Sequence, residues 1–130
     1  MSLHQPSKSK LGFFNEKLTE FFRDLSETFP EERDLKTGLE YIEFAKKSNP
    51  KLILDMFFEH VWVECHELVE KDDVDSVILY ARKKITNQYN EILPALSIFD
   101  KYWDTLDEGN RETIWKYLKV LCILCEKARV

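Results

Sequence analysis

The stretch that decides the fold is RETIWKYLKVLCILCEKA, residues 111–128, near the carboxyl end of the chain. Its apolar residues recur at helical spacing and occupy more than one face of the helix that they predict. A helix this apolar needs neighbours around most of its circumference. We therefore expect residues 111–128 to form a core helix on which the rest of the chain packs.

The same periodicity predicts five further helices ahead of this one, over residues 13–29, 31–47, 50–70, 74–89 and 94–106. Gly38 weakens the middle of the second of these helices and is expected to permit close packing there. The strand-like run Val61-Trp62-Val63 predicts a kink or a short break near His60 in the third helix. The fold class is therefore all-α, a single compact bundle of about six helices with an apolar C-terminal core helix.

Capping residues and prolines mark the predicted helix boundaries. Pro30 ends the first helix, and Asn49 followed by Pro50 is a typical start for the third. An Asp cap in the Lys71-Asp72-Asp73 turn precedes the fourth. The clearest boundary is Asp107-Glu108-Gly109-Asn110, which combines a Gly stop with an Asn cap before the last helix.

Composition supports one domain with a substantial core. The chain has 130 residues, of which 44% are hydrophobic and 13% aromatic, and this is enough to fold without a metal or disulfide. Three glycines are too few for a protein built from hairpins. Residues 1–12, MSLHQPSKSKLG, are polar and include Pro6 and Gly12, so we expect a flexible tail followed by a helical domain over residues 13–130.

Charge and cysteine usage indicate the compartment. The formal net charge of −5 describes an acidic protein without the positive field that nucleic-acid binders carry. Cys65, Cys122 and Cys125 are odd in number and lie in helical stretches, which indicates reduced thiols. The chain shows neither a signal peptide nor a run of 18 apolar residues, so we expect a soluble, intracellular protein without a membrane span.

Two motifs have the spacing of metal or redox sites. The segment His66-Glu67-Leu68-Val69-Glu70 resembles the start of a zinc-peptidase helix, but Glu70 stands where the second histidine belongs. Cys122 and Cys125 have the C-x-x-C spacing, and with His60, His66 or Cys65 they would supply a metal-ligand set. Because this pair lies within an apolar helix and not at a helix start, burial of the two thiols is the favoured interpretation, with zinc binding and redox chemistry as alternatives. No cofactor is expected.

Charged and aromatic side chains supply the candidate interaction surfaces. Arg82, Lys83 and Lys84 form a basic cluster, and a nucleic-acid site would need it to share one surface with the C-terminal cations Lys116, Lys119, Lys127 and Arg129. An acidic ridge, from which Glu64 and Glu67 are taken as candidates, comprises Glu64, Glu67, Glu70, Asp72, Asp73 and Asp75. Of the three tryptophans, expected to be core anchors, Trp62 and Trp103 are interaction candidates if they are exposed.

The two ends of the domain resemble a group of small, uncharacterised helical proteins encoded by large DNA viruses of algae and other protists. The resemblance rests on FNEKL at 14–18, DL at 24–25, FPE at 29–31, YWDTL at 102–106, Asn110 and IWKYL at 114–118. These are core and cap residues and not a catalytic motif. The resemblance implies a viral protein that works in the cytoplasm or nucleus of the host cell or is packaged in the virion, and it implies no chemistry.

The functional expectation follows from an excess of large apolar residues without an enzyme signature. The sequence contains no phosphate-binding loop, no G-x-S-x-G and no Rossmann fingerprint. We therefore expect a non-enzymatic helical module that binds a protein partner, which includes a second copy of itself. Nucleic-acid binding through residues 82–84 and the C-terminal helix is the second hypothesis, and a metal or redox protein using residues 122–125 is the third.

Overall fold

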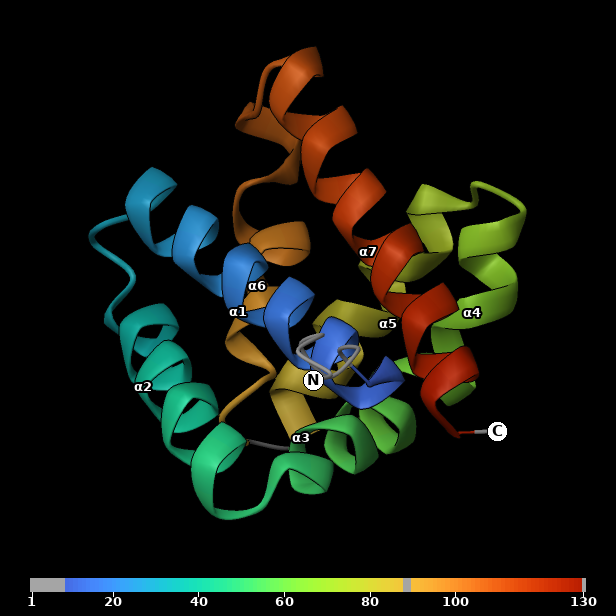
Figure 1. Ribbon diagram of the computed structural model, residues 1–130. Helices are drawn as coiled ribbons and strands as arrows, with labels where there is room; N and C mark the ends of the chain where they lie inside the picture. Colours follow the sequence, from blue (N-terminus) through green and yellow to red (C-terminus); the bar gives the residue numbers. More distant parts are fainter. Residues whose placement is uncertain (1–8, 88–89, 130) are drawn as a thin grey trace, which may run out of the picture.

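The computed structural model describes residues 9–87 and 90–129, and the regular secondary structure of this part of the chain consists of helices joined by short turns (Figure 1). The predicted all-α bundle is confirmed. The elements in order are α1 (Lys10–Thr28), α2 (Arg33–Ser48), α3 (Pro50–Phe57), the π-helical segment η1 (Phe58–Trp62), α4 (Val63–Glu70), α5 (Val74–Asn87), α6 (Pro94–Lys101), the 3-10 turn η2 (Trp103–Thr105) and α7 (Glu108–Arg129). None of the helices described is long and apolar enough to cross a membrane.

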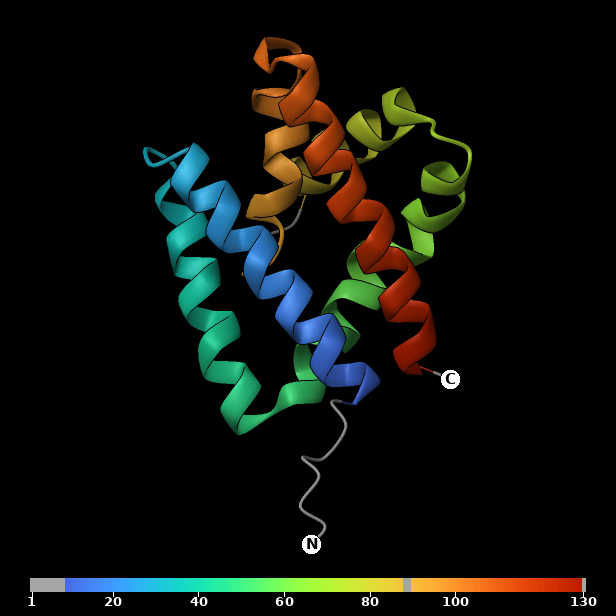
Figure 2. The same cartoon turned by 45° about the horizontal axis from the view of Figure 1, so that its top comes forward.

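Helix α1 has the most central position in the bundle. It packs against α2, α3 and α7, and Figure 2 shows it between α2 and α7. Its inner face carries large side chains at helical spacing, and Phe14 and Phe22 are completely buried. The apolar face predicted for residues 13–29 is confirmed. Its aromatic and aliphatic side chains recur on every turn of the helix, and packing that face against other helices removes them from water.

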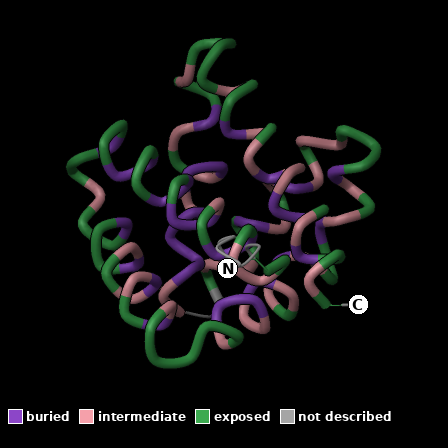
Figure 3. Tube along the Cα trace, in the orientation of Figure 1, coloured by how far each residue is buried: buried purple, intermediate pink, exposed green. Residues whose placement is uncertain are grey.

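Helix α7 contributes to the core through one stripe and not around its whole circumference. Its buried residues are Ile114, Leu118, Leu121, Cys122 and Cys125, which follow the spacing of a single helix face. Buried, half-buried and exposed residues alternate along it (Figure 3), and Ile123 is 52% exposed. The expectation that this helix is enclosed on several sides was therefore wrong, because α7 packs mainly against α1 and α4 and leaves a third side open.

The first helix begins earlier than the sequence pattern predicted. Ser9 caps it, since the Gly12 amide donates to the Ser9 hydroxyl oxygen at 2.9 Å. Residues 10–12 are therefore helical and do not belong to the predicted flexible tail of residues 1–12, because a glycine in the first turn does not outweigh a good cap. Residues 1–8 of that tail lie outside the described residues.

The predicted break near His60 is confirmed as the π-helical segment η1 between α3 and α4. The Tyr80 hydroxyl donates to the His60 carbonyl oxygen at 2.5 Å, which gives that carbonyl a partner outside its own helix. Pro50 occupies the first turn of α3 as predicted, although the Asn49 side chain makes no capping hydrogen bond. The expected Asn49 cap was therefore wrong.

Aspartate side chains cap the N-termini of α5 and α7. The Ser76 amide donates to Asp73 Oδ1 at 3.2 Å, which confirms the Asp cap predicted in the turn before α5. The Asn110 amide donates to Asp107 Oδ1 at 2.8 Å, so Asp107 caps α7. The boundary was predicted at the right place, but Gly109 and Asn110 lie inside the first turn and are neither a stop nor a cap, because Asp107 already satisfies the free amides.

Candidate functional site

An open groove of about 170 Å³ lies between α4 and α7 and is the main candidate site. One wall comes from η1 and α4 and the other from successive turns of α7. The groove is lined by Trp62, His66, Val69, Glu70, Lys119, Cys122, Ile123 and Glu126. Val69 and Cys122 are buried at its base, whereas Ile123, Glu70 and Glu126 are exposed at its edges.

Contacts at both ends of the groove hold α4 and α7 together. At one end Asp72, in the turn after α4, accepts hydrogen bonds from Lys119 Nζ at 2.6 Å and from Trp115 Nε1 at 2.9 Å. The Lys119 and Trp115 donors lower the pKa of the Asp72 carboxyl. Asp72 has a φ of 55°, a left-handed conformation that aspartate tolerates better than most residues. This turn therefore aims its carboxylate at α7.

At the other end Arg129 of α7 reaches back to the start of the α3–α4 segment. Its guanidinium donates to Asp55 Oδ1 at 3.1 Å and lies 3.6 Å from the centre of the Phe58 ring. The contacts of Asp72 and Arg129 therefore fix the two walls of the groove relative to each other at both ends.

Three stacked rings run along the α4 side of the site. The rings of Phe58 and Trp62 are 5.1 Å apart at 16°, and those of Trp62 and His66 are 3.7 Å apart at 1°. The His66 Nδ1 atom also lies 2.8 Å from the Trp62 carbonyl oxygen. Trp62 and His66, two residues singled out in the sequence, therefore form one rigid wall of the groove together.

The thiols near the groove are poor nucleophiles. Burial raises the pKa of Cys65 and of Cys125 to about 12, and it raises that of Cys122 as well. A redox C-x-x-C pair needs the opposite shift. Among residues 9–87 and 90–129, no three His, Cys, Asp or Glu side chains are placed to hold a metal ion. Cys65, Cys122 and Cys125 are buried as free thiols, in keeping with the burial favoured from the sequence.

The remaining interaction candidates lie outside the groove or in the core. Trp103 is buried and stacks on Phe99 with a centroid distance of 5.1 Å, so the exposure on which its candidacy depended is absent. The Arg111 guanidinium also lies 5.7 Å from the centre of the Trp103 ring. Glu67 is exposed beside His66, 4.0 Å from its ring nitrogen, and Glu64 is exposed on α4 outside the groove.

Three of the basic side chains predicted to form a nucleic-acid site pair with carboxylates on neighbouring elements. Arg82 of α5 pairs with Asp100 of α6 at 2.7 Å. On α7, Lys119 pairs with Asp72 and Arg129 with Asp55. Lys83 and Lys84 follow Arg82 on α5, which packs against α4 and α6. Three of the candidate cations, Arg82, Lys119 and Arg129, are thus bound in separate local pairs, which weakens the case for one nucleic-acid surface.

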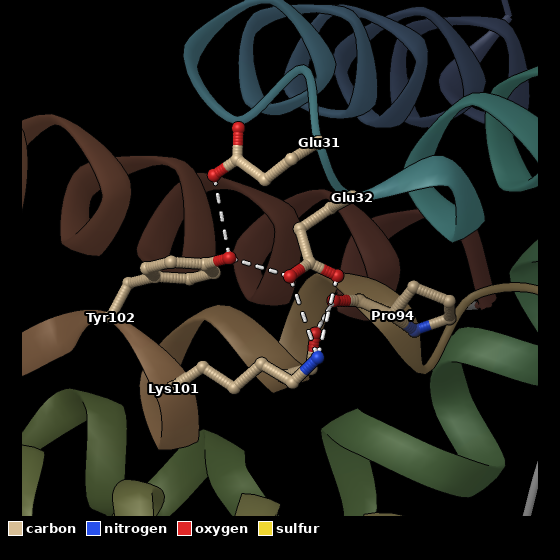
Figure 4. Close-up of polar contacts among 6 residues, drawn as sticks. Glu31, Glu32, Pro94, Lys101 and Tyr102 are labelled. Atoms are coloured by element: carbon tan, nitrogen blue, oxygen red, sulfur yellow. Dashed lines mark hydrogen bonds and ion pairs between the residues drawn. The ribbon is translucent and has the colours of Figure 1, made fainter.

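A polar cluster between the α1–α2 turn and the end of α6 is the second candidate (Figure 4). The Tyr102 hydroxyl donates to Glu32 Oε1 at 2.5 Å, and Lys101 Nζ lies 3.4 Å from both Glu32 oxygens. The Tyr102 ring stacks on Phe29 at 4.5 Å. The bond to Glu32 raises the pKa of Tyr102 to about 12, which makes this phenol a weaker acid than usual. We interpret the cluster as a set of contacts that joins the α1–α2 turn to the end of α6 and stabilises the fold.

The contacts of Glu32 in this cluster predict a free energy of unfolding that depends on pH. The Tyr102 bond lowers the pKa of Glu32 below 4.5, so its stabilisation is present above that pH and is lost as the pH falls through the folded value. Tyr102→Phe is expected to lower the free energy of unfolding at pH 7 by about 1 kcal/mol. The loss should shrink at an acidic pH below the folded-state pKa of Glu32, where its carboxyl is protonated. Urea unfolding of both proteins at pH 7 and at the acidic pH measures the two losses. Equal losses would contradict a stabilising Tyr102–Glu32 hydrogen bond that depends on an ionised Glu32.

The apolar pattern of residues 111–128 predicts that Ile123 is buried in the core, whereas the structure leaves it exposed at the edge of the groove. A signal was present, since the residues three and four positions away include Lys119, Glu126 and Lys127. Charged side chains at these spacings mark an exposed helix stripe. The sequence did not indicate Glu126 as a site residue, because the pairing of α4 with α7 depends on contacts between distant segments.

Comparisons with known proteins add no relative: no protein family, no curated protein and no solved structure matches this chain. They therefore bear neither on the viral resemblance nor on the function.

Proposed function

We propose that this chain is a non-enzymatic helical protein–protein interaction module that binds its partner at the groove between α4 and α7. The observation that carries the proposal is Ile123, a large apolar side chain that is 52% exposed beside the half-buried Trp62 and His66. A tryptophan beside an exposed aliphatic residue at a preformed groove is the arrangement of an interaction hot spot.

The size of the groove favours a protein partner over a small molecule. Sites for cofactors and drug-sized ligands usually have about 300–1,000 Å³. The groove has about 170 Å³, which suits one large side chain of a partner. The raised pKa of the Cys122 thiol at its base also argues against covalent catalysis there.

The setting of the module follows from the resemblance of its two ends. A viral accessory protein would meet its partner in the host cell, and a virion component would meet it in the particle. In either setting the partner is a protein, either a different chain or a second copy of this one. We do not expect nucleic acid among the partners.

Photo-crosslinking from the groove tests the proposal. Purified chain carrying benzoylphenylalanine in place of Ile123 is added to an extract of the cells that produce the protein. We expect one dominant cross-linked species at this position, because the groove holds a partner side chain in contact with residue 123. Mass spectrometry of that species identifies the partner.

The matched control carries the same cross-linker in place of Leu79, which is 62% exposed on α5 and does not line the groove. Equal cross-linking from both positions, or none from position 123, would contradict the proposal. Light scattering over a concentration series shows whether the cross-linked species is a second copy of the chain.

A further inference from the structure

We infer that the partner segment is a basic amphipathic helix, which inserts one large apolar side chain into the groove and places Lys or Arg against its rim. This inference rests on the proposed function and names the chemistry of the partner. It follows from the charge around the groove, the shape of the groove and the symmetry that a self-complex would need.

The rim of the groove is negatively charged. Glu70 projects from the α4 side and Glu126 from the α7 side, and both are exposed. Glu67, whose side chain is 73% exposed, adds a third carboxylate beside His66. The lining also contains Lys119, but Asp72 holds its ammonium at 2.6 Å and offsets its charge. With Lys119 paired, the carboxylates of Glu67, Glu70 and Glu126 give the rim an excess of negative charge, which attracts cations.

The shape of the site favours a helix as the partner. The groove follows two neighbouring helices, so a third helix can lie along it as helices do in bundles. A peptide that binds as an added β-strand would need an open sheet edge, and the described residues include no strand. A helix that presents an apolar residue, with cations three or four positions away, places both kinds of side chain on the face that meets the groove.

A second copy of this chain fits the same groove poorly. A two-fold dimer brings the same patch of both copies together. Glu70 and Glu126 of one copy would then approach Glu70 and Glu126 of the other, and both copies carry a formal charge of −5. Like charges placed face to face oppose association. A basic partner has no such penalty.

The test uses a synthetic amphipathic peptide of about 18 residues, five helical turns, with Leu on one face and Lys on the other. A second peptide has Glu at every Lys position. Fluorescence anisotropy of the labelled peptides measures their binding to the full chain. We expect the Lys peptide to bind and the Glu peptide not to bind, with affinity falling as salt rises from about 0.05 to about 0.5 M.

Variants separate the groove from the overall charge. The double variant Glu70→Lys with Glu126→Lys should weaken binding of the Lys peptide by at least about tenfold. The control Glu27→Lys with Glu40→Lys makes the same change of net charge at exposed positions on α1 and α2 and should bind nearly as wild type does. Ile123→Ser, which removes the apolar edge without changing charge, should also weaken binding, and circular dichroism shows that each variant is folded.

Three results would overturn the inference. Equal weakening by the groove pair and the control pair would mean that the peptide responds to net charge alone. Light scattering that shows a wild-type dimer, dissociated by Ile123→Ser, would make a second copy the occupant. A partner cross-linked from position 123 by a chain that does not bind the Lys peptide would leave the proposed function standing and refute only the basic helix.

Discussion

Phe14→Ala is expected to lower the free energy of unfolding by about 3–5 kcal/mol, the largest effect of any substitution considered. Phe14 is completely buried on α1 and packs edge-to-face on Phe57 of α3, with ring centroids 5.2 Å apart at 66°. Truncation removes that contact and leaves a cavity between two helices. Since domains are stable by about 5–15 kcal/mol in total, this is a large fraction.

The neighbouring residue supplies the control. Phe13 is 52% exposed, so Phe13→Ala makes the same chemical change one position earlier in α1 and should cost less than about 1 kcal/mol. Urea unfolding followed by far-ultraviolet circular dichroism measures both, with the slope of the transition unchanged. Similar losses for the two variants would show that α1 does not turn the face with Phe14 toward the core.

Gly38→Ala is expected to destabilise the protein by about 1–3 kcal/mol, although alanine is the better helix former. A Cβ atom at this position of α2 would lie 2.6 Å from Phe22 Cε2 and 2.7 Å from the Glu91 carbonyl oxygen. Phe22 is completely buried, and a backbone oxygen cannot rotate out of the way. The clash therefore outweighs the gain in helix propensity of about 1 kcal/mol.

The same substitution at Gly109 should have the opposite sign. A Cβ there would meet only Asp107 Oδ1 at 3.7 Å, an ordinary contact, and Gly109 lies in the first turn of α7. Gly109→Ala is expected to stabilise by about 0.4–1 kcal/mol through the unfolded state. Urea unfolding of the two alanine variants side by side compares them. A gain in stability at Gly38 would disprove the close approach of α2 to Phe22 and Glu91.

The groove was only partly predictable from the sequence. Trp62, His66 and Cys122 were singled out by residue type, and the structure brings all three to one site. Trp103 has the same chemistry as Trp62 and is buried, which residue type could not distinguish. What separates the two tryptophans is the set of helices that cover them, and this depends on contacts between distant segments.

The sequence by itself determined the helices, because the signals for a helix are local. Apolar spacing in residues 13–29, the Asp cap before α5 and Pro50 at the start of α3 each act within one or two turns. The break at η1 was also readable from Val61-Trp62-Val63. Each of these features depends on residues that are near one another along the chain.

The tertiary structure alone decided which side of α7 is buried and where the groove lies. The apolar residues of α7 cover more than one face, so its pattern is compatible with several orientations. The choice is made by α1, which covers one side, and by Asp72 and Arg129, which join α7 to the α3–α4 segment at two points. Ile123 stays exposed because burial depends on which neighbour covers a face, and local spacing does not encode that neighbour.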